Sequence, residues 1–443
     1  MKFLDLFFYQ PFLGVNIAQF FDTLCNNFIR NAITAAVIFG IIDVENNVAV
    51  SSLMVGILML PSFLFMATAG EIVDKYPKDA VIKILKFLQL FAAVLTCIGF
   101  LSHNIWILLI SLFFMGTFAA FLSTAKYSIL PDILPQSNLL AANGLMQMMV
   151  FLAILGGTIL GGIIFSIEPY LLYAILIIAS ILGFVFALLI PRQPKCSSDI
   201  TVNKNLIKAT IKNISFTMSH KNIAFYICAI SWFWFVGTVM ISIIPTFTKV
   251  IVNGNNAIFT LFIILFTVGL SLGTISCQAI SKGKVSDNFI LPCLILIIFS
   301  LLDLAFASVN YVPANDTIAL KPFITQWQGI HIVLGMLTFS FAGGIYIVPL
   351  TTMLQILSPN NSRAKIIASN NIINALFMII GSGLCAILLL LKAQVPIIFI
   401  ILALLNFIVF VVYILLNKAK KLKRVILIWI KSCLFIFTAI FLV

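Results

Sequence analysis

The chain has 443 residues, of which 62% are hydrophobic and only 9% charged, and its mean hydropathy is +1.20. A soluble protein carries about a quarter charged residues, so this composition excludes a soluble globular protein and indicates an integral membrane protein. The net charge is +13. Most Lys and Arg lie between apolar runs, so they favour membrane topology over nucleic-acid binding as the reason for this charge.

Twelve apolar runs are long enough to cross a bilayer as helices, which takes about 20 residues. They are too long for membrane strands and do not alternate as such strands do. The predicted spans are 12–41, 51–72, 84–101, 105–130, 139–165, 170–190, 223–250, 257–280, 288–309, 327–356, 364–391 and 395–416.

The first span carries polar side chains that are costly in hydrocarbon. Asp22, Asn26 and Arg30 follow one another at four-residue intervals and so share an arc of the helix. A charge at the bilayer centre costs about 2.5–3.5 kcal/mol even on insertion scales. We interpret the arc as the border of a wet substrate or ion path between two bundles. The alternative is a structural seam, such as an Asp22–Arg30 link through Asn26. The predicted path residues here are Gln19, Asp22, Asn26, Asn27 and Arg30.

The segment GEIVDKYPKD follows the second span and fits the Gly-x-x-x-Asp-(Arg/Lys)-x-x-(Arg/Lys) loop of the major facilitator superfamily. Gly70 is expected to permit a close approach of helices. Asp74 is expected to meet the start of the 364–391 span, near residues 362–365, and to latch the outward-open state. Lys75 and Lys78 would anchor at the inner leaflet. These four residues are the predicted gating loop.

Lys126 stands in STAKYSILPDILP, near the cytoplasmic end of the fourth span. We consider it as an inner-gate or headgroup contact. The alternative is a lysine that reaches along the helix to the membrane interface.

An internal repeat relates the two halves of the chain. AANGLMQMMVFLAILGG, from residue 141, matches ASNNIINALFMIIGSG, from residue 368. Asn143 aligns with Asn370, and Gln147 aligns with Asn374. These four amides, together with Asn371, complete the predicted substrate or ion path.

The long polar connection after the sixth span marks a boundary between halves. We therefore predict an all-α membrane protein with twelve transmembrane helices in two six-helix bundles, the plan of the major facilitator fold, plus an extra apolar C-terminal segment. The predicted parts are an N-terminal bundle, 1–190; a cytoplasmic linker, 191–221; a C-terminal bundle, 222–417; and a basic stretch with an apolar tail, 418–443.

Basic residues concentrate in the even-numbered loops, so both ends of the twelve-helix unit should face the cytoplasm. The basic residues of the even-numbered loop between the second and third spans are Lys75, Lys78, Lys83 and Lys86.

We expect no catalytic set, metal or cofactor. The eight cysteines form no CxxC or Cys/His cluster, and His103, His220 and His331 are far apart in the sequence. No phosphate-binding Gly-rich loop with a lysine is present, which argues against direct use of ATP.

Several phrases together resemble the bacterial lysophospholipid transporter family, which belongs to the major facilitator superfamily. They are QFFDTLCNNFIRNAI, GEIVDKYPKDAVIKILK, AKYSILPDILPQSNLLAANGLMQMMVFLAILGGTILGG, ISKGKVSDNFILP and GGIYIVPLTTMLQILSPNNSRAKIIASNNIINALFM. The resemblance implies inward movement of lysophospholipid, mainly lysophosphatidylethanolamine, across the bacterial inner membrane. It also implies a cytoplasmic-side acyltransferase as partner, which in some relatives is fused after the transporter.

The first span departs from the family pattern, which usually reads Asn-Asp-Asn followed by a lysine three residues on. The corresponding positions here hold Cys25, Asn26, Asn27 and Arg30. The acid stands instead at Asp22, one turn earlier. We interpret this as a carboxylate that has moved along its stripe.

The leading hypothesis is a secondary transporter, or flippase, for lysophospholipid. We expect a monomer with a lipid substrate and no nucleic-acid partner. One alternative is a major facilitator transporter of a small soluble solute or drug. Another is a membrane-embedded acyltransferase or its non-transporting partner; the absence of a His-x4-Asp pattern counts against the enzyme.

Overall fold

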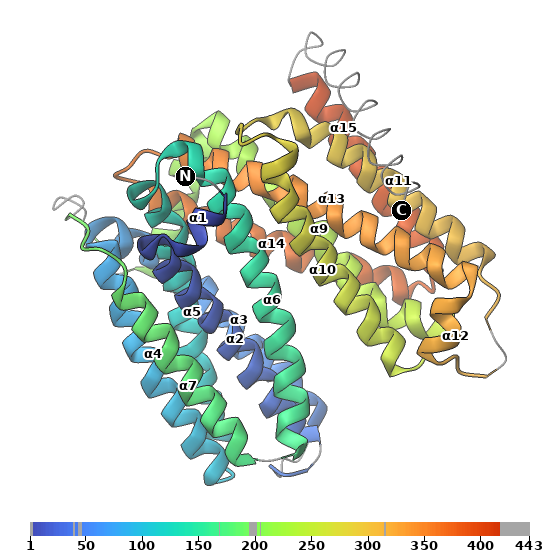
Figure 1. The fold of residues 1–443 in the computed structure, drawn as a ribbon, viewed down its shortest axis with the longest axis horizontal. Helices are drawn as coiled ribbons and strands as arrows, with labels where there is room; N and C mark the ends of the chain where they lie inside the picture. The colour runs from blue at the N-terminus through green and yellow to red at the C-terminus, as the bar shows by residue number, and fades with distance from the viewer. Residues whose placement is uncertain are drawn as a thin grey trace. The chain divides into compact units, whose positions relative to one another are not determined.

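The structure is a computed structural model that describes residues 3–38, 40–42, 47–167, 169–194, 202–203, 205–313 and 316–416. Within these ranges the chain is helical, apart from loops and a single parallel bridge between Gly254 and Ile318 (Figure 1). The basic stretch and apolar tail predicted for 418–443 lie outside the described residues.

Every predicted span coincides with a long helix. The twelve long helices are α2 (Gln10–Ile38), α3 (Asn47–Lys75), α4 (Lys78–Leu101), α5 (Ile105–Ile133), α6 (Leu139–Ile167), α7 (Pro169–Leu188), α9 (Lys221–Thr246), α10 (Asn256–Ile280), α11 (Ile290–Asn310), α13 (Trp327–Leu357), α14 (Arg363–Leu390) and α15 (Val395–Leu416). The largest boundary error is at α4, which begins six residues before the predicted residue 84 because Lys78, Asp79 and Lys83 belong to its first turns.

Eleven of the described helices are apolar and long enough to cross a membrane. The exception among the long helices is α2, which has 29 residues and contains the polar side chains of the predicted path. The expected all-α, twelve-helix membrane fold is therefore confirmed, with one helix that owes its low hydropathy to those residues.

Shorter helices connect the long ones. Their bounds are α1, Phe3–Phe8; α8, Leu206–Ser219; and α12, Leu320–Thr325; single 3-10 turns lie at Gln136–Asn138 and Asp287–Phe289, and a π-helical turn, Phe247–Val252, extends α9. Helix α8 lies in the predicted cytoplasmic linker. Asn205 caps its first turn by accepting a hydrogen bond from the backbone N–H of Lys208.

The described chain forms two compact units. Unit 1 contains the described residues of 1–231 and 351–376, and unit 2 contains those of 232–350 and from 377 onward. Unit 1 thus includes the last two turns of α13 and the first half of α14. The predicted bundles of 1–190 and 222–417 follow the internal repeat and not these contacts. That division stays a prediction.

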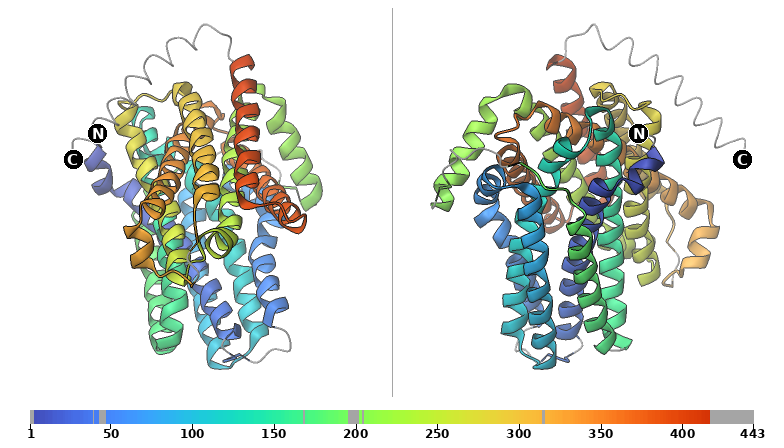
Figure 2. Two further views of the ribbon diagram at one scale, coloured as in Figure 1. Left: turned by 90° about the vertical axis from the view of Figure 1, so that its right-hand side faces the viewer. Right: turned by 60° about the vertical axis from the view of Figure 1, so that its left-hand side comes forward.

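Unit 1 is built around α2, which packs against α5, α6 and α7 (Figure 1). Helix α5 also packs against α3 and α4, and α4 packs against α7; Figure 2 shows α4 and α7 running side by side. The core between these helices contains fully buried side chains such as Phe28, Ile33 and Leu112.

Glycines on α6 set the contact with α2. A Cβ added at Gly157 would lie 2.5 Å from the carbonyl oxygen of Leu24, and one at Gly161 would lie 2.5 Å from that of Phe28. Only glycine fits these positions, because the obstacle is backbone. Gly156 and Gly162 face roomier surroundings: the nearest atom to an added Cβ lies at 3.9 Å for Gly156, and none lies within 4 Å for Gly162.

Unit 2 has its own apolar core. Phe247, Phe262, Phe323 and Phe399 are fully buried, and their rings contact one another in edge or tilted geometry. Helix α11 packs against α15.

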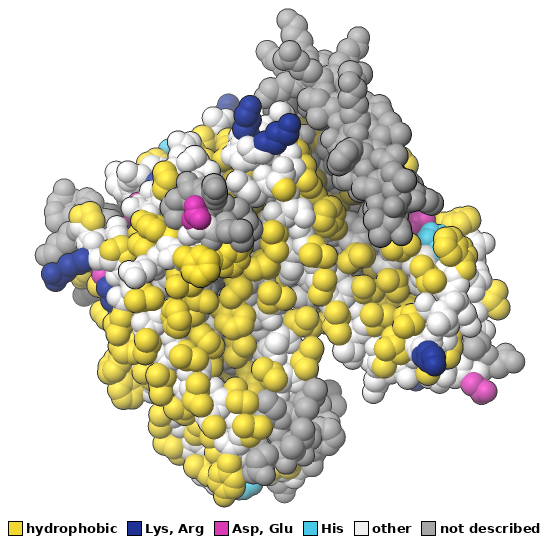
Figure 3. Space-filling view, viewed as in Figure 1, with side chains coloured by type: hydrophobic (Ala, Val, Ile, Leu, Met, Phe, Trp, Pro, Cys, Tyr) yellow, Lys and Arg dark blue, Asp and Glu magenta, His cyan; other side chains and the backbone are white. Residues whose placement is uncertain are grey.

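Apolar side chains also cover the outside of the long helices. On the face drawn in Figure 3, they extend along the sides of the unit 1 helices, and the Lys and Arg side chains lie toward helix ends and loops. Phe87, Phe91 and Ile98 of α4, for example, are each at least 47% exposed. Such an apolar outer surface is what a protein surrounded by lipid requires.

Candidate functional site

The polar arc of α2 is divided in two by the packing of unit 1. Gln19, Asp22 and Asn26 are buried, with 0%, 6% and 8% exposure. Asn27 and Arg30 are partly exposed. The buried set is enclosed within unit 1 in this structure, and the border of a wet path along the whole arc stays a prediction. An arc of about 140° is wide enough to contact two different surroundings.

The buried set contacts other charged and amide groups inside unit 1. Lys86 of α4 and Lys126 of α5 interact electrostatically with the Asp22 carboxylate, and the side chains of Asn26 and Gln89 lie within hydrogen-bonding reach of it. Lys86 Nζ also donates a hydrogen bond to Gln89 Oε1. With all three ionised, one carboxylate and two ammonium groups leave the cluster with a net charge of +1.

Lys86 was assigned from the sequence to a cytoplasmic loop, and this assignment is wrong. It lies in the third turn of α4 with 1% of its surface exposed. Its stem lies against Gly183 of α7, where an added Cβ would be 2.8 Å from Lys86 Cε and 2.9 Å from Nζ. The glycine therefore makes room for a buried lysine that the apolar surroundings would otherwise exclude.

Lys126 is also buried, with 8% exposure. It lies seven residues before the last residue of α5, about 10 Å along the helix. Because the side chain is enclosed and interacts with Asp22, the alternative of a lysine reaching to the interface does not describe it. Whether it contacts a headgroup or inner gate stays a prediction.

The partly exposed set forms a continuous polar face, which we call the α2 polar face, made of Thr23, Asn27, Arg30, Asn31 and Thr34. Arg30 Nη2 donates to Asn27 Oδ1 at 3.1 Å, and Asn31 Nδ2 donates to the Asn27 carbonyl at 2.7 Å. Asn31 also reaches Thr158 of α6 at 3.4 Å. Arg30 therefore pairs with Asn27 rather than with Asp22, so the Asp22–Arg30 link considered from the sequence is not formed.

Gln19, at the buried end, instead joins α2 to α6. Its Nε2 donates to the carbonyl of Met146 at 3.0 Å and to Asn16 Oδ1 at 3.0 Å. The bond to Met146 crosses between the two helices, and the bond to Asn16 stays within α2.

The amides predicted from the repeat are separated into distinct contacts. Asn143 exchanges two hydrogen bonds with Gln355, of 2.6 and 3.1 Å, and also donates to Thr352. This contact joins α6 to the end of α13. Gln147, one turn further along α6, is 5% exposed.

On α14, Asn371 donates to Ser123 of α5 at 3.3 Å, and Asn374 accepts from Ser231 of α9 at 2.7 Å. Asn370 donates weakly to Asn371 at 3.4 Å, and its Oδ1 is buried without a hydrogen-bond partner in the described chain. A buried amide oxygen of this kind has capacity to accept a hydrogen bond.

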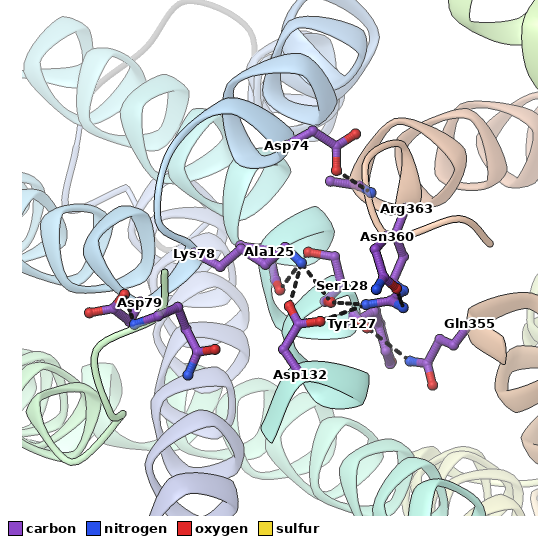
Figure 4. A network of polar contacts seen from close by, with 12 residues as sticks. Asp74, Lys78, Asp79, Ala125, Tyr127, Ser128, Asp132, Gln355, Asn360 and Arg363 are labelled. Atoms are coloured by element: carbon purple, nitrogen blue, oxygen red, sulfur yellow. Dashed lines mark hydrogen bonds and ion pairs between the residues drawn. The ribbon is translucent and has the colours of Figure 1, made fainter. Parts of the chain in front are cut away.

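The predicted contact of Asp74 with the start of α14 is present. Its carboxylate accepts hydrogen bonds from the backbone N–H groups of Ala364 and Lys365, each 2.9 Å long. Figure 4 shows Asp74 beside the start of α14, where Arg363 lies. Asp74 is fully buried. It binds the positive end of the α14 dipole, where free N–H groups need acceptors. The role of this contact as a latch of one transport state stays a prediction.

Gly70 allows this approach. An added Cβ there would lie 2.9 Å from both Lys365 Cα and Ala368 Cβ. Lys75 is partly exposed and lies over the ring of Tyr76, 5.8 Å from its centroid.

Lys78 was predicted to anchor at the inner leaflet, but it is 2% exposed and forms an ion pair with Asp132 of α5. Arg363 of α14 binds the second oxygen of Asp132 at 2.8 Å (Figure 4). Asp132 therefore joins the first residues of α4 and α14 to the end of α5. Sequence reasoning missed Asp132 and the role of Arg363. The usable signal was the lone acid Asp132 near the end of the predicted span, in AKYSILPDILP.

These geometries occur in a chain with the fold of a membrane transporter. The profile of the Major Facilitator Superfamily matches residues 15–382, and the chain belongs to this superfamily.

Among its relatives are proteins named lysophospholipid transporter LplT. The one from Photorhabdus laumondii is 25% identical over 407 residues, which is 88% of this chain and 92% of the relative. The one from Serratia proteamaculans is 25% identical over 318 residues, 71% of this chain and 73% of the relative. The family resemblance inferred from the sequence is thus confirmed.

Solved structures share the fold. A bacterial homologue of the iron transporter ferroportin, in an outward-facing state, has a TM-score of 0.67 at 16% identity and covers 91% of this chain and 98% of its own. The human organic anion transporter MFSD10 has a TM-score of 0.66 at 12% identity, covering 90% and 98%. At this identity the likeness concerns the fold alone.

Proposed function

We propose that this protein is a secondary transporter that moves lysophospholipid, of the lysophosphatidylethanolamine kind, across the bacterial inner membrane by alternating access. The proposal is supported by the similarity to named lysophospholipid transporters over most of the chain. The structural observation that carries it is the α2 polar face, which places a guanidinium and two amides within a membrane-spanning helix.

The chemistry of this face suits a phosphodiester headgroup. Arg30 presents a planar donor that matches phosphate oxygens, and Asn27 and Asn31 add neutral donors and acceptors without further charge. Arg30 lies eight residues before the end of α2, about 12 Å along the helix, so it is within the hydrocarbon depth. A phosphate bound there would compensate a cation that is otherwise costly in the bilayer.

We assign the buried cluster of Asp22, Lys86 and Lys126 a supporting role. The three charges join α2, α4 and α5 within unit 1 and so hold the α2 polar face in a fixed orientation. A buried charge cluster of this kind requires every partner, because removal of one leaves the others uncompensated.

The proposal extends to location and partners. Both ends of the twelve-helix region face the cytoplasm, in line with the basic loops between even-numbered spans. The transporter acts as a monomer and delivers its lipid to an acyltransferase on the cytoplasmic side. It needs no nucleic-acid partner and no cofactor.

Uptake by proteoliposomes tests the transport proposal. Vesicles containing the purified protein are expected to accumulate labelled lysophosphatidylethanolamine faster than protein-free vesicles. Accumulation no faster than in protein-free vesicles, together with uptake of a small soluble solute, would replace the lipid transporter with the soluble-solute alternative.

A substitution of Arg30 tests its assignment as the residue that binds the headgroup phosphate. Arg30→Gln keeps a polar side chain but removes the guanidinium, and it is expected to reduce uptake about tenfold or more, because a charge-assisted bond to phosphate is lost. Lys249→Gln removes a basic charge from an exposed position outside α2 and is the matched control. Equal uptake by the two variants would remove Arg30 from the headgroup site.

A further inference from the structure

Helix α8 has two faces of different character, and other helices cover only one of them. Ala209, Asn213 and Thr217 follow one another at four-residue intervals and are fully buried. Asn213 Nδ2 donates to the carbonyl of Ala67 in α3 at 3.1 Å, and the Thr217 hydroxyl donates to the hydroxyl of Ser369 in α14 at 3.0 Å. The face that holds α8 against unit 1 is therefore made of small and polar side chains.

The opposite side of α8 carries an exposed apolar stripe, made of Ile207, Ile211 and Met218. These side chains lie within about 40° of one another around the helix. Their exposed fractions are 73%, 64% and 37%. A helix on the surface of a soluble protein directs its apolar stripe toward the core, whereas α8 directs its stripe outward. The stripe therefore requires an apolar medium or an apolar partner outside the chain.

The charge beside this stripe is positive. Lys208 and Lys212 are exposed, and each follows a stripe isoleucine by one residue, about 100° around the helix. Helix α8 contains no Asp or Glu. Lys365 of α14 adds a further basic group, because its Nζ lies over the ring of Phe216, 5.3 Å from the centroid. An occupant of the stripe that is negatively charged at its edge would complement these lysines.

The contacts of α8 place it near the ends of two membrane-spanning helices. Ala67 lies eight residues before the end of α3, about 12 Å along the helix, and Ser369 lies six residues after the start of α14, about 9 Å. The headgroup region occupies about 5–8 Å on each side of the hydrocarbon. Helix α8 is therefore at the level where acyl chains meet headgroups, the depth of an interfacial amphipathic helix.

We infer that α8 is a membrane-surface helix that binds anionic phospholipid. Its apolar stripe enters the acyl-chain boundary, and Lys208 and Lys212 contact the headgroups of the same leaflet. The inference depends on the membrane location of the chain and not on which lipid the protein transports. The competing occupant is a soluble protein, which would have to reach the stripe at headgroup level; this depth favours lipid.

Quenching by brominated lipids tests the inference in the full-length chain. A fluorophore is attached to Ile211→Cys, in a background without the eight native cysteines, and the protein is placed in phosphatidylcholine nanodiscs. A small fraction of the lipid is brominated phosphatidylcholine or brominated phosphatidylglycerol. We expect both to quench the fluorophore, and the anionic lipid to quench about threefold more strongly, because basic residues at the surface enrich anionic lipid. Adding Lys208→Gln and Lys212→Gln should make the two lipids quench equally.

Lys282→Gln/Lys284→Gln is the matched control, because it removes the same charge from exposed positions just after α10. It should leave the preference for phosphatidylglycerol unchanged. A fluorophore at residue 211 that neither lipid quenches overturns the inference and leaves the stripe to a protein partner. Equal quenching by the two lipids with all lysines present overturns the assignment of anionic lipid.

Acylation of lysines provides a second measurement on the protein without substitutions. A membrane-impermeant N-hydroxysuccinimide ester is applied to nanodiscs with and without phosphatidylglycerol, and each modified lysine is quantified by mass spectrometry. The anionic lipid should slow modification of Lys208 and Lys212 severalfold relative to Lys282 and Lys284 in the same sample. Equal slowing at all four lysines would reflect the surface potential alone and would contradict a lipid contact at α8.

Discussion

At the scale of single residues, the orientation of each polar side chain on α2 decides its role. Helical spacing predicted which residues share the arc, and α2 is helical over all of them. It could not separate Asp22, which is buried and interacts electrostatically with Lys86 and Lys126, from Arg30, which is partly exposed. The separation depends on where α4 and α5 pack. A local hint existed, since Lys86 and Gln89 are polar at i, i+3 within an apolar run.

Asp22→Asn is expected to destabilise the protein, because it leaves two buried lysines without their carboxylate. The carboxylate interacts electrostatically with both lysines, and a buried charge that loses its compensating group is destabilising. The melting temperature in detergent should fall clearly, and uptake should fall with it. The double variant Asp22→Asn/Lys86→Gln removes one charge of each sign and should recover part of the loss. Identical melting of the single variant and the wild type would show that the cluster contributes nothing to stability.

At the scale of elements, close packing of α2 against α6 depends on two of four neighbouring glycines. Gly157→Ala places a methyl group 2.5 Å from a backbone oxygen of α2, so the helices must separate. We expect a melting temperature several degrees lower than that of the wild type. Gly156 is the preceding residue, and a Cβ added there lies 3.9 Å from the nearest atom, Leu24 Cδ1. Gly156→Ala should melt at or slightly above the wild-type temperature, because alanine favours the helix. Equal melting of both variants would contradict the assigned contact.

The start of α14 offers a second test at this scale. Asp74→Asn removes the charge and one of two acceptors for the N–H groups of Ala364 and Lys365. Loss of a helix cap costs about 1 kcal/mol, and more for a buried site. We expect lower thermal stability and altered gating, measured by cysteine accessibility from each side. Glu71→Gln is the control, since Glu71 accepts a single backbone N–H, from Asn203 in the linker. An Asp74→Asn variant that transports and gates like the wild type would show that this contact does not latch a transport state.

The elements themselves were largely predictable. Apolar run length located all twelve long helices, because the bilayer fixes the length that a span needs. Basic turns were less informative, since Lys78 and Lys86 are buried in α4 rather than exposed in a loop. Pairing across helices, as for Asp132 with Lys78 and Arg363, needs tertiary contacts that no local pattern encodes.

At the scale of the whole molecule, the compact units do not follow the internal repeat. The repeat relates 141–157 to 368–383, yet residues 351–376 pack with unit 1. The reason lies in particular contacts: Asn143 with Gln355, Asn371 with Ser123, and Asp74 with the start of α14. Repeat symmetry in the sequence predicts ancestry of the helices and not which helix ends pack together.

The central claim is that the α2 polar face borders the lipid headgroup within the membrane. The most direct measurement is labelling by a membrane-impermeant maleimide, in a background without the eight native cysteines, of Asn31→Cys and of Ala32→Cys. Residue 31 is partly exposed, whereas Ala32 is fully buried in the core. We predict that Asn31→Cys is labelled, that Ala32→Cys is not, and that lysophosphatidylethanolamine slows the labelling at residue 31. Labelling at neither position, or labelling at residue 31 that the lipid leaves unchanged, would contradict the account.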